Sequence, residues 1–202
     1  MRLIVFSLIA LVCVMPVWAG ERADRSGTPD PAGLPVVVRA VEVGNLPPHG
    51  SLEFQWRGYP FRVVRRTGQD LERLRRSPAT EAGSEGGAPH AIMTSLGCHE
   101  CIKPDGYAQS LHRSPDPEYF VMLSVGPHYG CYISYFPPGD DNRWPNGERV
   151  ELGQGWTGGF YDPCHDIRYD LAGRPFPNSL SGRNLFVPRY RITGAGLLIM
   201  GE

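Results

Sequence analysis

Two short segments of this chain carry side chains that can bind metal ions. Residues 126–131 read Gly-Pro-His-Tyr-Gly-Cys, and residues 162–167 read Asp-Pro-Cys-His-Asp-Ile. Imidazoles and carboxylates are ligands of both Zn²⁺ and Fe²⁺, so His128, His165 and Asp162 are candidate ligands of a single metal ion. The alternative is that these three side chains are hydrogen-bonded or solvent-facing and hold no metal.

A separate Cys-x-x-Cys motif lies at Cys98 and Cys101. The same spacing occurs in redox-active dithiols, in one half of a zinc site, and in disulfides that close a small loop. A complete zinc site needs two more ligands, and the neighbouring His90, His99 and His112 show no set spacing. The motif alone therefore does not choose between these chemistries.

Residues 1–19 have the composition of an export signal. Arg2 is the only early charge, a mostly apolar run extends to Met15, and small side chains precede a cleavage point after Ala19. A membrane span needs about 20 apolar residues, so a cleaved signal peptide is expected and an uncleaved N-terminal anchor is the alternative. A periplasm or other exported compartment is oxidising, which favours disulfides among the remaining cysteines. Cleavage leaves four of the five cysteines, and four cysteines allow three pairings.

The elements that must position these side chains are predicted to be mainly strands. The chain contains 25 glycines and 20 prolines in 202 residues, which favours short strands and turns over long helices. Alternating apolar residues predict a hairpin over residues 51–64, and an apolar run predicts a buried strand over residues 119–125. We also expect a short helix at residues 69–76 and a closing hairpin at residues 191–200.

The length and net charge of the chain limit the number of domains and the kinds of partner that we expect. Its 202 residues suit one domain behind a leader. Residues 20–40 are predicted to be a linker, and residues 41–202 a single domain with insertions near residues 77–116 and 132–156. The net charge of −1 provides no general basic field, so nucleic acid is not an expected partner.

Several arginines gather around the predicted helix and the strand before it. The expected interpretation is a solvated helix face, and the alternative is a docking face for an anionic partner. These residues are Arg62, Arg65, Arg66, Arg73, Arg75 and Arg76.

Four blocks of the sequence occur in the order of a known family. Residues 56–60 read Trp-Arg-Gly-Tyr-Pro, the two Cys/His segments follow, and residues 184–190 read Asn-Leu-Phe-Val-Pro-Arg-Tyr. In this order the blocks resemble the Rieske iron–sulfur subunit of cytochrome bc1 complexes, the ubiquinol–cytochrome c reductases. The boxes of that family read Cys-x-His-x-Gly-Cys and Cys-x-Cys-His. The resemblance spans about residues 41–76 and 117–202.

This resemblance implies both a fold and a disulfide. The implied fold is mainly β: a Rieske-like antiparallel β sandwich with a small two-loop, cluster-binding-type subdomain and one or two short helices. The two loops face each other in the family, which would bring His128, His165 and Asp162 together. The resemblance implies a disulfide between Cys131 and Cys164, because the family cysteines at these positions are bonded to each other. The pairing expected with it is Cys98 with Cys101, and redox thiols or a metal ligand pair remain the alternatives for these two residues.

The sequence departs from the family at the first position of each box. Gly126 and Asp162 stand where the family has its two cysteine ligands. A Rieske [2Fe–2S] centre binds one iron through two thiolates and the other through two imidazoles, and one carboxylate cannot replace two thiolates. Ile167 replaces a family serine that donates to a bridging sulfide, and Tyr169 is expected to have lost its sulfur acceptor. A [2Fe–2S] cluster is therefore not expected.

The leading expectation is an exported Rieske-like domain that has lost its cluster and acts as a structural or protein-binding subunit of a cell-envelope complex. On this expectation the chain has no enzyme activity of its own and no cofactor, and the alternatives would make it a subunit of an oxidoreductase or a protein that binds a single Zn or Fe ion. Its partners are protein subunits of an envelope or respiratory complex, and it meets the membrane only through an N-terminal anchor if the leader is retained. One alternative is an electron-transfer iron–sulfur subunit of a ubiquinol–cytochrome c reductase. The other is a protein that binds a single Zn or Fe ion through His128, His165 and Asp162.

Overall fold

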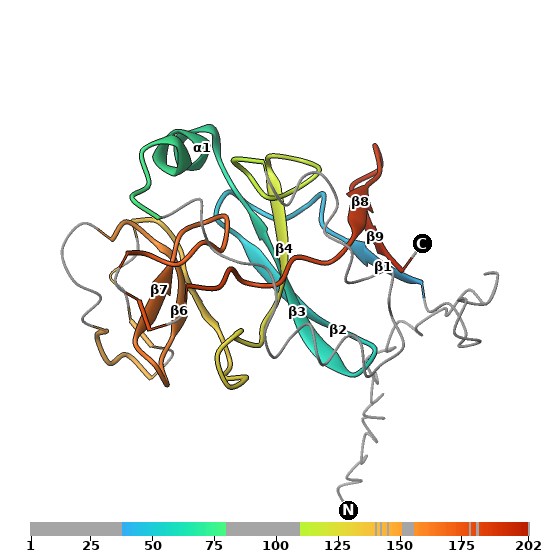
Figure 1. The fold of residues 1–202 in the computed structure, drawn as a ribbon. Helices are drawn as coiled ribbons and strands as arrows, with labels where there is room; N and C mark the ends of the chain where they lie inside the picture. The colour runs from blue at the N-terminus through green and yellow to red at the C-terminus, as the bar shows by residue number, and fades with distance from the viewer. Residues whose placement is uncertain are drawn as a thin grey trace, which may run out of the picture.

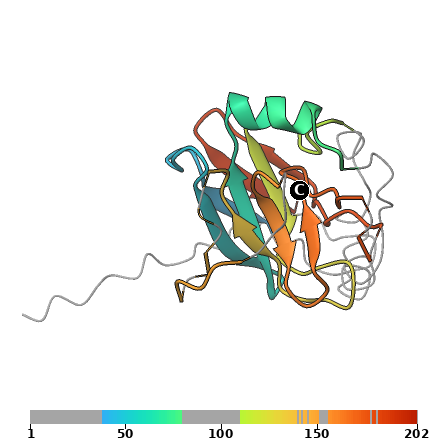
Figure 2. The same ribbon diagram turned by 90° about the vertical axis from the view of Figure 1, so that its left-hand side faces the viewer.

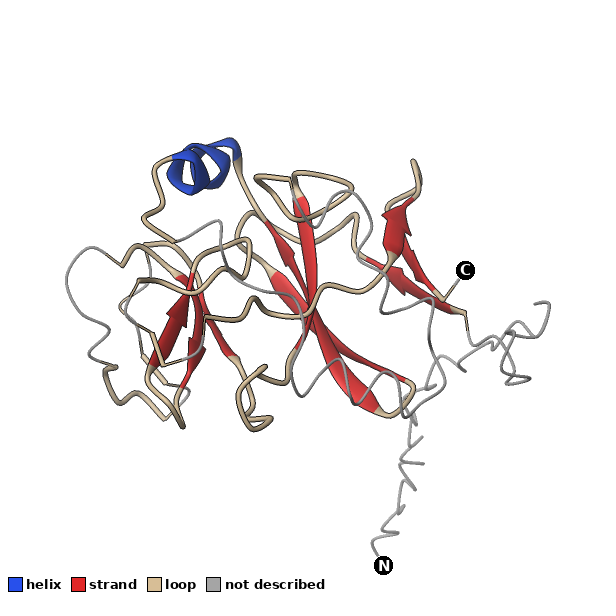
Figure 3. Ribbon diagram, in the orientation of Figure 1, coloured by secondary structure: helices blue, strands red, loops and turns tan. Residues whose placement is uncertain are grey.

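The structure is a computed structural model that describes residues 38–79, 110–139, 141, 143–144, 146–150, 156–177, 179–180 and 182–201. These residues form nine strands and one helix (Figures 1 and 3). The elements in chain order are β1 Arg39–Glu42, β2 Ser51–Trp56, β3 Tyr59–Arg65, α1 Gly68–Arg75, β4 Tyr119–Leu123, β5 Ser134–Phe136, β6 Gly159–Asp162, β7 Ile167–Tyr169, β8 Tyr190–Ile192 and β9 Leu197–Met200. The predicted leader and most of the predicted linker lie outside the described residues. Strand β1 begins just inside the range expected for the linker.

The described strands form three antiparallel sheets, with the orders β1-β9-β8, β2-β3-β4 and β5-β6-β7. The sheet β2-β3-β4 lies between the other two (Figure 1). Val121 and Leu123 of β4 pack with Leu198 of β9, whereas Phe120 of β4 packs with Phe160 of β6. Successive side chains of a strand point to opposite faces. Because one face of β4 packs in each of these two clusters, β4 is buried at every position. These antiparallel sheets confirm the predicted mainly β fold class.

The predicted hairpin over residues 51–64 is formed by β2 and β3. Trp56 and Tyr59 are the register pair that closes it, and Arg57 and Gly58 make the turn with φ of 51° and 80°. Positive φ at both central residues matches the right-handed twist of the flanking strands. The predicted strand at 119–125 and the closing hairpin are also confirmed, as β4 and as β8 with β9.

Helix α1 lies at one end of the sheets, and the β6–β7 hairpin turns at the opposite end (Figures 1 and 2). The amide of Asp70 donates to the Thr67 hydroxyl, and the Asp70 carboxylate accepts from the Thr67 amide at 2.8 Å, which makes a capping box. Leu74 and the partly buried Leu71 pack against Leu171. The helix therefore begins and ends one residue before the predicted range. Within the described residues no helix has the length and apolarity needed to cross a membrane.

Arg66 departs from the expected solvated arginine face, because only 2% of its surface is exposed. Its guanidinium donates to the carbonyl oxygens of Pro117 and His112, each at 2.9 Å, and to Leu171 at 3.2 Å. It also donates to the Ser114 hydroxyl. Burial lowers the pKa of Arg66 to about 10, so the side chain keeps its charge at neutral pH. These bonds fasten the start of α1 to two distant loops.

Most of the remaining arginines of this group pair with nearby carboxylates. Each such pair neutralises a positive charge, which weakens the alternative of a docking face for an anionic partner. The pairs are Arg62 with Glu53, Arg65 with Glu118, Arg73 with Asp70, and Arg75 with Glu72.

Candidate functional site

The loop between β4 and β5 carries the first Cys/His segment. An antiparallel bridge pairs Val125 with Tyr132, and the Gly126 amide donates to the Cys131 carbonyl oxygen at 2.7 Å. Tyr129 lies at the tip of this loop with a φ of 55° and is 84% exposed. The segment is therefore a narrow reversal of the chain whose base is held by backbone hydrogen bonds.

The turn between β6 and β7 carries the second Cys/His segment. Asp162 and Ile167 are the register pair nearest the turn. Within the turn, Asp166 has a φ of 52°, and its carboxylate accepts from the Tyr161 hydroxyl at 3.1 Å. Ile167 is fully buried in the core beneath the turn. This second loop is thus fixed to a buried hairpin.

A disulfide between Cys131 and Cys164 joins the two loops. Their Cα atoms are 6.3 Å apart, and the cysteines are separated by 33 positions in the sequence. The predicted pairing of these two residues is confirmed. Cys98 and Cys101 lie outside the described residues, so their pairing stays a prediction.

The two histidines of the loops are in contact. The ring centroids of His128 and His165 are 4.5 Å apart, and the rings are nearly perpendicular. The Nδ1 atom of His165 lies 3.0 Å from Oδ2 of Asp162. If Nδ1 carries the proton it donates to the carboxylate, and Nε2 is then the ring nitrogen that is free for another partner. Asp162 therefore lies behind His165 and orients its ring.

Asp162 is a buried carboxylate with defined partners. It has no exposed surface, and its Oδ1 atom accepts from the Cys164 amide at 2.9 Å. A Cβ atom built at Gly126 would lie 3.2 Å from Asp162 Oδ2 and 3.0 Å from Ile133 Cδ1. The two positions where the family has its cysteine ligands are therefore neighbours in space. The Asp162 carboxylate and Ile133 occupy the space in front of Gly126.

Two buried hydroxyl groups on the inner side of this region lack a hydrogen-bond partner among the described residues. They belong to Tyr169 and Ser124, and both residues have no exposed surface. Burial, followed by the negative charge of Asp162, raises the pKa of Tyr169 above its ordinary value. Tyr169 therefore stays neutral and keeps a hydroxyl proton that it donates to no described group.

The donors of the two loops do not fit a Rieske [2Fe–2S] cluster. Such a cluster takes two thiolates and two imidazoles. The loops provide His128 and His165, but Gly126 has no side-chain donor, and Cys131 and Cys164 are bonded to each other. The residues present lack both thiolates that the cluster needs.

The structure also brings together a set of ligand atoms that the sequence reasoning missed. The sulfur atoms of Cys131 and Cys164 and a carboxylate oxygen of Asp162 all lie within 4.8 Å of one another. The sequence could have indicated this group, because a disulfide to Cys164 places both sulfurs near Asp162, which lies two positions before Cys164. Of the predicted metal ligands, His128 contacts His165, and His165 contacts Asp162. Binding of one metal by all three stays a prediction.

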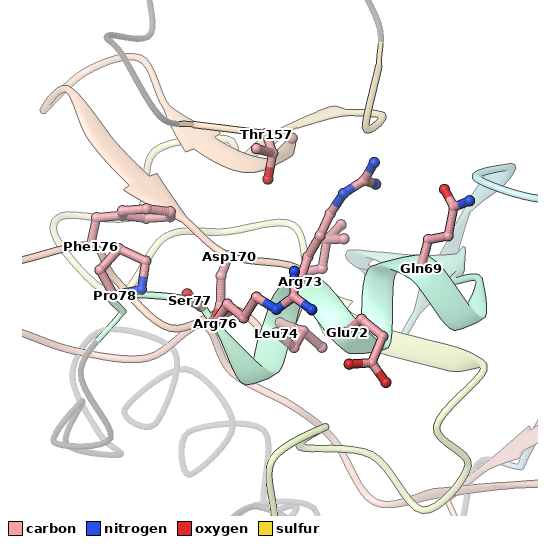
Figure 4. Close-up of a pocket in the computed structure, with 12 residues that line it drawn as sticks. Gln69, Glu72, Arg73, Leu74, Arg76, Ser77, Pro78, Thr157, Asp170 and Phe176 are labelled. Atoms are coloured by element: carbon pink, nitrogen blue, oxygen red, sulfur yellow. The ribbon is translucent and has the colours of Figure 1, made fainter.

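A cleft of about 480 Å³ lies near the other end of the molecule, between α1 and the residues around β6 and β7. Arg73 and Arg76 lie on its helix side, and Thr157 lies across from them (Figure 4). Arg73 is already paired with Asp70. No residue of the two Cys/His loops lines this cleft, so it is separate from the candidate site.

An antiparallel β fold with two His/Cys loops joined by a disulfide is the arrangement implied for a Rieske-like domain. The chain is 30% identical over 198 residues to the ubiquinol-cytochrome c reductase iron-sulfur subunit of Allochromatium vinosum, covering 98% of this chain and 80% of that protein. It is 26% identical over 161 residues to the mitochondrial cytochrome b-c1 complex subunit Rieske of Lagothrix lagotricha, of which it spans 44%. A chain of the hyperthermophilic respiratory Complex III matches with a TM-score of 0.35 and 16% identity, over 78% of this chain and 71% of that one. No family model matches the sequence.

The chain belongs to the family of Rieske iron–sulfur subunits of ubiquinol–cytochrome c reductase. The Allochromatium relative carries this assignment, because the match reaches 30% identity and covers most of both proteins. The site described above is therefore a variant of the family's cluster-binding region.

Proposed function

We propose that this protein is a Rieske-family subunit that carries no [2Fe–2S] cluster and acts as a structural or protein-binding subunit of a bc1-type complex in the cell envelope. Family membership supports the kind of assembly, since the relatives are named as subunits of ubiquinol-cytochrome c reductase and of the cytochrome b-c1 complex. The donor inventory of the two loops supports the absence of the cluster. The partners on this proposal are protein subunits of that complex, and the compartment is the periplasm.

One observation carries the proposal: the Asp162 carboxylate is buried and bonded within its own loop. It accepts from the Cys164 amide and lies 3.0 Å from His165 Nδ1, so its position is fixed by protein groups. A ferric iron of a Rieske centre needs two anionic sulfur donors, whereas Asp162 offers hard oxygen atoms and Gly126 offers none. The same bonds hold the second loop in shape, so the loop does not need a cluster to be ordered.

Iron and sulfide analysis tests this proposal directly. The full chain and the Allochromatium relative would be produced in one host and purified in parallel under anaerobic conditions. We expect less than about 0.1 iron per chain for this protein, with no charge-transfer absorption and no EPR signal after reduction, because both thiolate ligands are missing. The relative serves as the control for cluster assembly in that host. About two irons and two sulfides per chain of this protein would overturn the proposal in favour of an electron-transfer subunit.

The protein-binding role has its own test. The chain would be tagged at its C-terminus and expressed with the cytochrome b and cytochrome c1 subunits of its own bc1-type complex. We expect the tagged chain to co-purify with these subunits at about equal amounts, even though it carries no iron. Recovery of the subunits as a stable complex without the tagged chain would contradict this part of the proposal.

A single metal ion held by the histidines is a second candidate function. It is favoured by the contact between His128 and His165 and by the hydrogen bond between His165 Nδ1 and the Asp162 carboxylate, since a carboxylate behind a histidine is a common support for a metal ligand. Metal analysis of freshly purified protein would show a stoichiometric metal that His128→Ala removes. A wild-type protein without bound metal would exclude this candidate.

A further inference from the structure

The disulfide and Asp162 together form an unusual group of metal-ligand atoms. Both sulfur atoms and a carboxylate oxygen lie within 4.8 Å of one another. In a tetrahedral zinc site with Zn–S distances of about 2.3 Å and Zn–O distances of about 2.0 Å, the ligand atoms are about 3.3–3.8 Å apart. Small side-chain rotations therefore suffice to direct Cys131, Cys164 and Asp162 at one ion once the two sulfurs are separate.

Asp162 is already oriented for such a role. Its carboxylate is buried and held by the Cys164 amide and by His165, so little side-chain entropy is lost when it binds a cation. The bond from His165 is the kind of contact that orients a carboxylate ligand and tunes its basicity. The polypeptide around the ligands is also fixed, because Cys131 and Cys164 lie in loops held by strands on both sides.

The sulfurs lie where a reductant and a metal can reach them. Cys164 is exposed and Cys131 is half-buried, whereas Asp162 is fully buried. We propose that reduction of the Cys131–Cys164 disulfide converts the junction of the two loops into a zinc site formed by Cys131, Cys164 and Asp162, with water as the fourth ligand. The inference rests on the cluster-free site proposed above.

The proposed conversion has two balanced steps. A dithiol reductant gives two electrons and two protons to the disulfide, so that the S–S bond breaks, two thiols form, and the reductant becomes a disulfide. Zn²⁺ then binds both sulfurs as thiolates and releases their two protons to solvent. In the reverse direction a disulfide of the same class takes two electrons from the thiolates and two protons from solvent and becomes a dithiol, while the Cys131–Cys164 bond forms again and Zn²⁺ is released.

Zinc binding to the full chain tests this inference, in a Cys98→Ser/Cys101→Ser background that removes the other Cys-x-x-Cys. The protein would be reduced with tris(2-carboxyethyl)phosphine, and binding of Zn²⁺ alone would be followed by calorimetry, with Co²⁺ absorption as a report of thiolate ligation. We expect about one zinc per reduced chain, at least 100-fold weaker binding by the oxidised chain, and a thiolate-to-cobalt charge-transfer band. Asp162→Asn should weaken binding at least 10-fold, whereas the matched control Asp166→Asn should leave it unchanged.

A second measurement avoids any variant that fails to fold. Zinc should slow alkylation of Cys131 and Cys164 in the reduced protein at least 10-fold, as read by mass spectrometry. Equal alkylation with and without zinc, or zinc binding that survives Cys131→Ser, would overturn the inference. Iron is measured on the same oxidised sample, so stoichiometric iron there contradicts the proposed function, and failed zinc binding after reduction contradicts this inference alone. His128→Ala separates this site from one built on the two histidines, because it should leave reduced-state binding intact.

Discussion

The corner around Arg66 and the region around Tyr169 both bury polar side chains, but the two regions differ in whether these side chains have hydrogen-bond partners. Arg66 donates to three backbone carbonyl groups and one hydroxyl group. The Tyr169 hydroxyl, next to the two loops, has no partner among the described residues. Buried polar groups in folded proteins are nearly always hydrogen-bonded. The Arg66 guanidinium is therefore satisfied by protein atoms alone, whereas the loop region keeps a hydroxyl donor that no described residue uses.

Substitution of Arg66 should have the largest effect on stability. Arg66→Met removes the donor but leaves three carbonyl oxygens and the Ser114 hydroxyl buried without it, so we expect the free energy of unfolding to fall by about 3–5 kcal/mol. Urea unfolding followed by circular dichroism measures the change. Arg75→Met is the matched control, since Arg75 pairs with Glu72 on the surface and should cost about 0.5 kcal/mol or less. Equal losses in the two variants would contradict the structural role assigned to Arg66.

Removal of the disulfide should have the next largest effect, and the effect should centre on the loops. Cys131→Ala/Cys164→Ala frees a span of 33 positions, which corresponds to about 3–4 kcal/mol in the chain-entropy model. We expect the midpoint of urea unfolding to fall while hydrogen exchange in β2, β3 and β4 keeps its order of protection. Loss of native protection throughout the central sheet before any denaturant is added would show instead that the framework depends on the tied loops.

The same comparison explains how much of the molecule could be predicted from its sequence. The β2–β3 hairpin and β4 follow from local alternation, a turn pair and an apolar run, all of which are visible in a short window. The Cys131–Cys164 pairing came from the family resemblance, because cysteine spacing alone allowed three pairings. Burial of Arg66 could not be foreseen, since its acceptors at His112 and Leu171 lie 46 and 105 positions away in the sequence.

The sequence indicated which side chains of the two loops lie close together, but not their geometry. His128, His165 and Asp162 were identified from residue type and box position. The hydrogen bond between His165 Nδ1 and the Asp162 carboxylate depends on the tight turn between β6 and β7, where Asp166 takes a positive φ. The grouping of Asp162 with the two sulfurs likewise depends on how the second loop folds back on the first.

Neutralising Asp162 should have a smaller effect than removing the disulfide. Asp162→Asn keeps the shape of the side chain but loses the charge that strengthens its bonds to the Cys164 amide and to His165, so we expect a loss of about 1–3 kcal/mol. Chemical unfolding at neutral pH measures it. The neighbouring Asp166→Asn is the control: Asp166 is exposed, and its loss should stay near 0.5 kcal/mol. If Asp166→Asn proved the more costly of the two, Asp162 would not be the group that holds the second loop.

Removal of the Tyr169 hydroxyl should have the smallest effect and the opposite sign. Burying an unpartnered hydroxyl costs free energy, so Tyr169→Phe should leave stability unchanged or raise it by about 0.5–1 kcal/mol. Tyr190→Phe is the matched control, because the buried Tyr190 hydroxyl donates to the Tyr119 carbonyl oxygen at 2.8 Å and its loss should cost about 1 kcal/mol.

The pH dependence of the free energy of unfolding checks the Tyr169 hydroxyl independently. Burial, and then Asp162, raise the pKa of Tyr169, so above about pH 10 the phenol ionises in the unfolded chain while it stays neutral in the folded one. The unfolded state then binds fewer protons, and wild-type stability falls as the pH rises through this range. Tyr169→Phe should remove part of that fall. If Tyr169→Phe instead destabilised the protein at neutral pH as much as Tyr190→Phe, the hydroxyl would have an acceptor after all. The first acceptor to look for would be a sulfur atom of an iron–sulfur cluster at the neighbouring loops. If such a cluster were found, the proposal that the protein carries none would fail.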